Sequence, residues 1–139
     1  MKTKVIAFDV YGTILCANDP ENAMPPRRGF IEFAKNCQKE GIVLVTSSDN
    51  ELPLTKIDLK ESGVPIELFF DHYQMMVWQP KYFLPIVEFF AIQPDELLVF
   101  GDRPECDIEP AIKQGCRAVL VPPYNTGDSF DWMSMIEYL

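Results

Sequence analysis

The chain is poor in histidine and in basic residues, and it has no long apolar run. His72 is the single histidine and the four cysteines show no CxxC spacing, so a zinc centre is not expected. The 12 lysine and arginine residues face 21 aspartate and glutamate residues, and the net charge of −9 argues against nucleic-acid and anionic-membrane partners. Neither a signal-peptide pattern nor an apolar run of about 18 residues is present. We therefore expect a soluble, cytoplasmic protein that binds neither nucleic acid nor membrane.

The size and the composition are those of one domain. With 139 residues and 47% hydrophobic content, the chain is long enough to bury a core, and we expect a single domain over residues 1–139. Apolar runs alternate with segments of helical periodicity, which is typical of an α/β fold built on one doubly wound parallel sheet. The expected strands are residues 5–8, 42–46, 68–70, 97–101 and 118–121, and the expected helices are residues 30–39, 51–61, 83–92 and 108–114.

Two further segments bear on the domain organisation. The tail from about residue 129 to 139 places apolar side chains at the i, i+3, i+4, i+7 spacing of a helix. We expect this helix to dock on the chain's own sheet, with a partner-binding helix as the alternative. Residues 14–28 contain three prolines and two asparagines, and this turn-rich stretch is too short to build a separate lid domain.

Aspartates follow two of the expected strands. The apolar run at residues 5–8 leads into Asp9, and the later run leads into Gly101 and Asp102, with Asp107 five residues further on. Ligands of open α/β sheets bind outside the carboxyl ends of the strands, so these carboxylates are expected at a ligand site. Three converging carboxylates repel one another unless a hard divalent cation holds them ionised. Magnesium fits best, because it prefers oxygen ligands and often binds one or two carboxylates together with a substrate phosphate.

These aspartates and their neighbours resemble the motifs of the haloacid dehalogenase (HAD) superfamily of hydrolases, most of whose members are magnesium-dependent phosphatases. Motif I resembles DVYGT, which begins at Asp9, and motif IV resembles GDRPECD, which carries Asp102 and Asp107. Motif II resembles the end of VLVTSS, with Thr46 as the phosphate-binding hydroxyl and Ser47 as the alternative.

The resemblance covers residues 4 to about 122, which is nearly the whole chain. It implies the strand order 5-4-1-2-3, in which the first and fourth strands lie side by side and bring Asp9 within reach of Asp102. It also implies a core without a cap domain, because the stretch after the first strand offers no room for one.

The chain departs from the family's pattern at two positions. The family's phosphatases carry a second aspartate two residues after the nucleophile, as the general acid and base, where this chain has Tyr11. A phenol with an ordinary pKa near ~10 can donate a proton but is a poor base at pH 7, and tyrosine here is similar to the dehalogenase branch. In motif III the family's lysine usually precedes a proline; here Gln79 does so, and Lys81 lies two residues further on.

The resemblance therefore implies a magnesium-dependent hydrolase of the phosphatase type, which forms an aspartyl-phosphate on its nucleophile. In this interpretation Thr13 orients the nucleophile, while Thr46 and Lys81 bind phosphate oxygens. The alternatives are a weak or inactive magnesium-binding pseudoenzyme and a dehalogenase-like hydrolase. The expected partner is a phosphorylated substrate that the sequence leaves unidentified, and the oligomeric state stays open. The implied catalytic residues are Asp9, Tyr11, Thr13, Thr46 and Lys81, and the implied metal ligands are Asp9, the main-chain carbonyl of Tyr11, Asp102 and Asp107.

Overall fold

A five-stranded parallel sheet forms the centre of the computed structural model, which describes residues 2–16, 25–124 and 128–139. The strands lie in the order β3-β2-β1-β4-β5, which confirms the predicted α/β class and strand order. The central strand β1 is apolar throughout and buried, as expected for a strand covered on both faces. The strands are β1 (Val5–Phe8), β2 (Val43–Ser48), β3 (Asp71–Gln74), β4 (Leu97–Gly101) and β5 (Arg117–Leu120).

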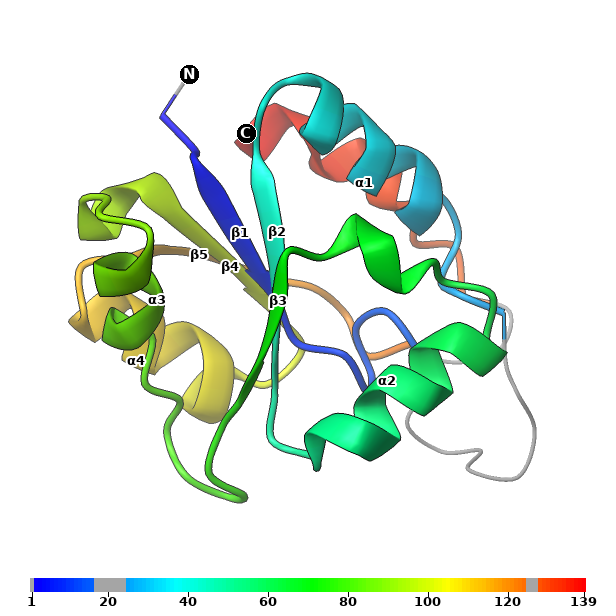
Figure 1. The fold of residues 1–139 in the computed structure, drawn as a ribbon, viewed down its shortest axis with the longest axis horizontal. Coiled ribbons are helices and arrows are strands. Elements are labelled where there is room, and N and C mark those ends of the chain that lie inside the picture. The colour runs from blue at the N-terminus through cyan, green and yellow to red at the C-terminus, as the bar shows by residue number, and fades with distance from the viewer. Residues whose placement is uncertain (1, 17–24, 125–127) are drawn as a thin grey trace.

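Helices cover both faces of the sheet. In Figure 1, α1, α2 and the C-terminal segment lie on one face, and α3 and α4 lie on the other. The helices are α1 (Phe30–Lys39), α2 (Leu52–Glu61), α3 (Leu84–Phe89) and α4 (Glu109–Lys113). A single π-helical turn, Pro104–Ile108, precedes α4, and short 3₁₀ segments occur at Ile66–Leu68, Pro94–Glu96 and Trp132–Tyr138.

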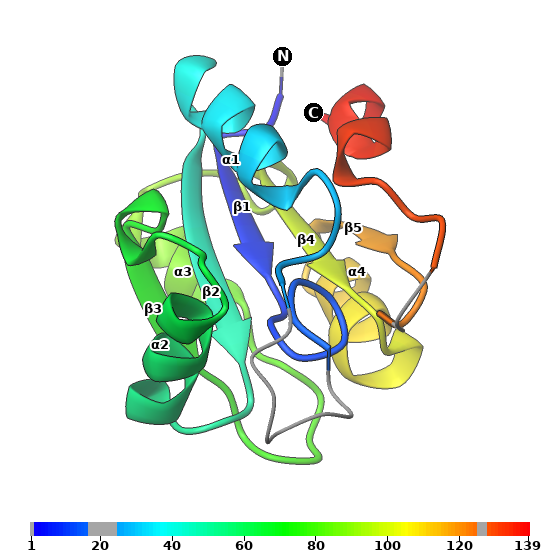
Figure 2. The ribbon, with the colours of Figure 1, turned by 90° about the vertical axis from the view of Figure 1, so that its right-hand side faces the viewer.

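The larger apolar core is aromatic and lies between the sheet and α1. The ring of Phe8 in β1 stacks on Phe100 of β4 at a centroid distance of 5.7 Å and meets Trp132 edge-on at 5.4 Å. Trp132 is fully buried, so the C-terminal 3₁₀ segment packs onto the core beside α1 (Figure 2). A second apolar cluster lies on the other face of the sheet, under α3 and α4.

The predicted third strand is wrong. Residues 68–70 were expected to be extended, but a 3₁₀ turn ends at Leu68 and the strand begins at Asp71. The apolar run of Leu68 and Phe69 fills the aromatic core as a turn, whereas the strand has the polar sequence DHYQ because it lies at the edge of the sheet. The last helix also differs, since residues 132–138 are 3₁₀ rather than α-helical.

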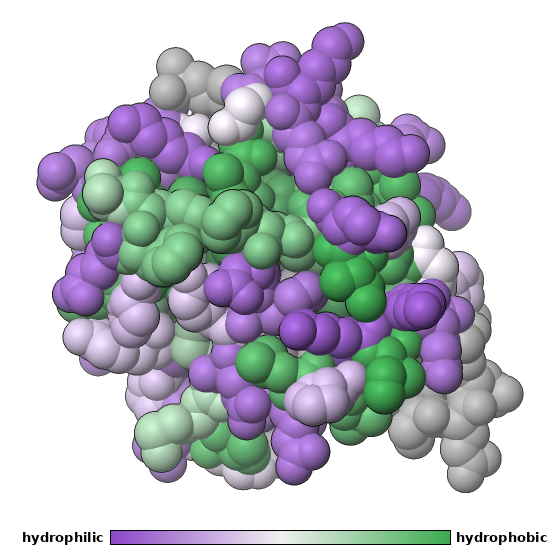
Figure 3. Space-filling view, in the orientation of Figure 1, coloured by the Kyte–Doolittle hydropathy of each residue, from purple (hydrophilic) through white to green (hydrophobic). Residues whose placement is uncertain are grey.

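The surface view shows an apolar patch over the edge of the sheet, between the start of β3 and α3 (Figure 3). Phe70 and Phe89 are exposed there, with their rings 6.1 Å apart. Among the described residues, no helix combines the length and the apolar composition that crossing a membrane requires. The described residues form this one sheet, its helices and the loops between them. Residues 17–24, in the stretch where a cap would be inserted, lie outside the described residues, so the expectation of a capless core stays a prediction.

Candidate active site

The carboxyl ends of the central strands bring the predicted aspartates together. Phe8 pairs with Phe100 in the register between β1 and β4, and the main-chain N–H of Asp9 donates to the carbonyl of Phe100 at 2.9 Å. The residues that leave these two strands, Asp9 and Asp102, therefore emerge side by side. Asp107 joins them from the π-helical turn that follows β4. One carboxylate oxygen from each of the three aspartates lies within 4.8 Å of the other two.

Two glycines leave the space that this cluster occupies. A Cβ atom at Gly101 would lie 2.4 Å from the carboxylate carbon of Asp107, and one at Gly12 would lie 2.4 Å from Oδ2 of Asp102. Gly12 also has a φ of +84°, a conformation that residues with a side chain rarely adopt. The glycines of the DVYGT and GDRPECD motifs are thus required by the close approach of the two loops.

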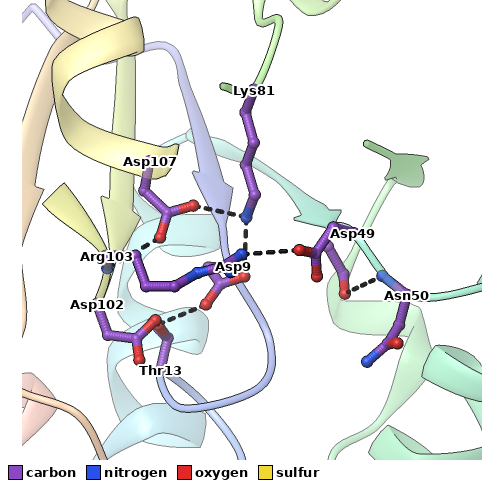
Figure 4. A network of polar contacts seen from close by, with 9 residues as sticks. Asp9, Thr13, Asp49, Asn50, Lys81, Asp102, Arg103 and Asp107 are labelled. Carbon is purple, nitrogen blue, oxygen red and sulfur yellow. Dashed lines mark hydrogen bonds and ion pairs between the residues drawn. The ribbon is translucent and has the colours of Figure 1, made fainter. Parts of the chain in front are cut away.

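Lys81 places its ammonium group inside the cluster (Figure 4). Its Nζ lies 2.8 Å from Oδ1 of Asp9 and 2.6 Å from Oδ1 of Asp107, and the side chain is buried. Desolvation lowers the pKa of Lys81, but the two carboxylates outweigh it and hold the pKa above its ordinary value, so the lysine is charged. Gln79, which precedes the proline of motif III, is exposed. Of these two residues, the structure brings Lys81 into the site.

The aspartates carry more negative charge than one lysine offsets. Burial raises the pKa of Asp102 to about 7, and the neighbouring Asp9 and Asp107 carboxylates add to this effect. The pKa of Asp107 is also raised, first by burial and then by Asp9. Thr13 is fully buried and its hydroxyl donates to Oδ2 of Asp9 at 3.0 Å, which fixes the carboxylate's orientation. A donor set made only of oxygens, buried at Asp9 and Asp107 and half-buried at Asp102, with excess negative charge fits a hard divalent cation such as magnesium.

The two hydroxyls considered for motif II lie on opposite faces of β2. Strand alternation places Thr46 on the side of the aromatic core, where its Oγ1 lies 2.8 Å from Nδ1 of His72. Thr46 pairs with Phe8 in the register between β2 and β1, so the next residue, Ser47, is level with Asp9. Ser47 lies on the same face of β2 as Val45, which belongs to the second apolar cluster. The Ser47 hydroxyl is buried and makes no hydrogen bond among the described residues. It is the hydroxyl that is free to bind a ligand beside Asp9.

The side chain of Tyr11 is not available as a general acid or base. Its hydroxyl donates a hydrogen bond to Oδ2 of Asp58 on α2. Burial, reinforced by this hydrogen bond to Asp58, raises the pKa of the phenol, so Tyr11 remains protonated and its proton is already engaged. The role of the Tyr11 main-chain carbonyl as a metal ligand stays a prediction.

Sequence reasoning missed an ion pair that bridges two strand ends. The guanidinium of Arg103, one residue after Asp102, lies with Nη2 2.8 Å from Oδ2 of Asp49, which directly follows β2. The main-chain N–H of Arg103 also donates to Oδ2 of Asp107 at 3.1 Å. The signal available in the sequence was position alone, because Asp49 directly follows VLVTSS and Arg103 lies inside GDRPECD.

No protein-family model matches this chain, and no curated protein matches it either. Solved structures do match. A predicted phosphoglycolate phosphatase from Haemophilus somnus 129PT aligns over 92% of this chain and 89% of its own, at 15% identity and a TM-score of 0.75. An L-2-haloacid dehalogenase from Xanthobacter autotrophicus, with chloropropionic acid covalently bound, aligns over 89% and 79%, at 11% identity and a TM-score of 0.71.

A third similar structure is the N-terminal part of protein BF1531 from Bacteroides fragilis, described as containing a phosphatase domain complexed with Mg. It aligns over 87% of this chain and 37% of its own, at 16% identity and a TM-score of 0.69. Other neighbours are HAD-superfamily hydrolases by name. The chain therefore has the fold of the HAD-superfamily hydrolases, and its neighbours include both phosphatases and a dehalogenase.

Proposed function

We propose that this protein is a magnesium-dependent HAD-like hydrolase of the phosphatase type, with Asp9 as its nucleophile. The observation that supports this best is the setting of the Asp9 carboxylate, which Lys81 and Thr13 hold beside Asp102 and Asp107. Each Asp9 oxygen accepts one hydrogen bond from these partners, and a carboxylate oxygen has two lone pairs. Asp9 can therefore be oriented by the protein and still present a lone pair to a substrate.

In the proposed reaction, an Asp9 oxygen attacks the phosphorus of a phosphomonoester. The bond from phosphorus to the ester oxygen breaks, the leaving group departs with that electron pair, and water then hydrolyses the aspartyl-phosphate. Lys81 and the Ser47 hydroxyl would bind phosphate oxygens, and Thr13 would keep Asp9 in position. Magnesium, held by Asp9, Asp102 and Asp107, would supply charge neutralisation for the transferring group.

Tyr11 is the residue that favours a second candidate, a magnesium-binding protein with weak or no turnover. Because its proton is engaged with Asp58, Tyr11 neither protonates the leaving group nor activates water, and it stands where the family's phosphatases carry the aspartate that does both. Phosphate esters whose leaving groups need little protonation are therefore the expected best substrates. A dehalogenase-like displacement at carbon also dispenses with protonation, and the haloacid dehalogenase among the neighbours keeps it as a further alternative.

A screen of phosphorylated metabolites and aryl phosphates, with and without magnesium, tests this function. We expect magnesium-dependent release of phosphate that Asp9→Asn abolishes, since an amide cannot act as this nucleophile. Asp95→Asn is the matched control, because Asp95 forms an exposed ion pair with Lys2. Haloacid turnover without phosphate release would favour the dehalogenase, and magnesium binding without turnover of either substrate would favour the pseudoenzyme.

A further inference from the structure

Trp78 has an unusual position for a large aromatic residue. It lies in the connection between β3 and α3, and 78% of it is exposed. Its φ is +59°, in the left-handed region that bulky residues rarely occupy. Strained backbone of this kind costs free energy and gathers at ligand-binding and catalytic sites. The protein therefore exposes an indole ring at a residue whose backbone conformation is unfavourable for a large side chain.

The neighbours of Trp78 tie it to the candidate active site. Lys81, three residues further along, reaches Asp9 with its Nζ at 2.8 Å. The guanidinium carbon of Arg103 lies 5.7 Å from the centre of the Trp78 ring. Arg103 in turn follows Asp102 directly. Trp78 is therefore connected on one side to the lysine and on the other to the acidic motif of the same site.

Arg103 is held across the end of β1. Its guanidinium pairs with Asp49 at the end of β2, while its backbone belongs to the end of β4, and β1 lies between these two strands. Figure 4 shows the side chain reaching from β4 toward Asp49. Because Asp49 already offsets the charge of Arg103, the guanidinium that lies over the Trp78 ring is not a free cation. The paired guanidinium of Arg103 therefore does not favour ligands that carry a second anionic group.

We propose that Trp78 and Arg103 form a leaving-group subsite that accepts a planar, uncharged ring. The inference rests on the proposed phosphatase function, and it narrows the substrate to a phosphomonoester of an aryl or heterocyclic alcohol. The ring of the leaving group stacks on the exposed indole, while the phosphate binds beside Asp9, within reach of Lys81. Aromatic pairs of this kind contribute beyond the burial of their area.

Equilibrium binding of phosphonates tests the subsite, because a phosphonate has no leaving group and so separates ring recognition from leaving-group chemistry. In calorimetry with saturating magnesium, we expect the wild-type protein to bind phenylphosphonate about 3- to 10-fold more tightly than methylphosphonate. Trp78→Ala should remove this preference and Trp78→Phe should keep most of it. Met76→Ala is the matched control, because Met76 is an equally exposed apolar side chain of the same connection.

Equal affinity of the wild-type protein for the two phosphonates would overturn the subsite and leave the proposed function standing. A preference for phenylphosphonate that survives Trp78→Ala would also overturn it, since the ring would then bind elsewhere. Failure of both phosphonates to bind in the presence of magnesium would instead remove the phosphate site, and the subsite with it.

Discussion

Ser47 and Thr46 show how strand alternation divides two neighbouring hydroxyls between structure and chemistry. Thr46 is satisfied by His72, and burial lowers the pKa of that histidine, so the pair is a neutral hydrogen bond on the core side. The Ser47 hydroxyl has no partner among the described residues and lies on the other face, level with Asp9. A buried hydroxyl without a partner costs free energy, which a bound phosphate oxygen would recover.

The matched variants Ser47→Ala and Thr46→Val separate these roles. Ser47→Ala should weaken the binding of inorganic phosphate with magnesium by about 10- to 100-fold, the range for a hydrogen bond to a charged group. Thr46→Val should leave phosphate affinity unchanged and lower the free energy of unfolding by about 1 kcal/mol, because it leaves His72 unpaired. Calorimetry and urea unfolding measure the two effects, and the reverse pattern would assign the phosphate-binding role to Thr46.

Tyr11 separates the active from the inactive interpretation. Tyr11→Asp alone would bring a new carboxylate toward Asp58, the acceptor of the native phenol, so repulsion would oppose its correct placement. The informative variant is therefore Tyr11→Asp combined with Asp58→Asn. A positioned general acid and base raises a rate by roughly 10²- to 10⁴-fold. We expect the double variant to raise kcat on phosphate esters by a factor in that range.

Asp58→Asn alone is the control and should give no gain in turnover. The comparison requires folded protein, checked by circular dichroism, at saturating magnesium. A folded double variant that gains nothing on any phosphate ester would show that more than the acid and base is missing, and would favour the non-catalytic interpretation.

At the scale of elements, the C-terminal 3₁₀ segment contributes one fully buried aromatic residue to the core, and Met133 and Met135 pack against the same cluster. Trp132 is fully buried and meets the rings of Phe8, Phe33 and Phe100, which come from β1, α1 and β4. Trp132→Ala should therefore destabilise the protein by about 3–5 kcal/mol, the range for removing a buried aromatic ring. Ile136→Ala, in the same segment but partly exposed, should cost far less. Urea unfolding of the two variants makes the comparison, and a loss for Trp132→Ala as small as that for Ile136→Ala would mean that the segment packs only loosely.

The elements also show where sequence patterns suffice. The apolar strands β1 and β4 and the helix α1 follow from their patterns because each is buried along a whole face, and hydrophobic periodicity reports burial. β3 was misplaced because an edge strand buries little, so its polar sequence carries no such signal. Lys81 was an implied site residue that no sequence pattern could place, because it lies in a connection outside the strands. Ser47 was only the alternative to Thr46, since the register of β2 against β1 decides which of the two hydroxyls is level with Asp9.

For the whole molecule, the acidic cluster couples stability to pH and to magnesium. The pKa of Asp102 is raised from 3.8 to about 7 in the folded protein, and that of Asp107 is raised as well. Between pH 3.8 and about pH 7 the folded chain binds more protons than the unfolded chain, so the free energy of unfolding falls as the pH rises through this range. Lys81, whose pKa is raised above 10.5, contributes the same stability throughout this range.

The lowered pKa of the buried His72 acts in the opposite direction below its ordinary value of 6.5. In a chelator, the urea midpoint of unfolding should therefore be lower at pH 8 than at pH 6.5. Magnesium binds the ionised carboxylates of the folded state, so millimolar magnesium should raise the midpoint at pH 8 more than at pH 6.5 and reduce the difference. Asp102→Asn should make the midpoint in chelator less dependent on pH and weaken the response to magnesium, whereas Asp95→Asn should do neither. A urea midpoint that does not change with pH would remove the main electrostatic support for a magnesium-dependent hydrolase. A magnesium response that is unchanged in Asp102→Asn would mean that the metal binds elsewhere.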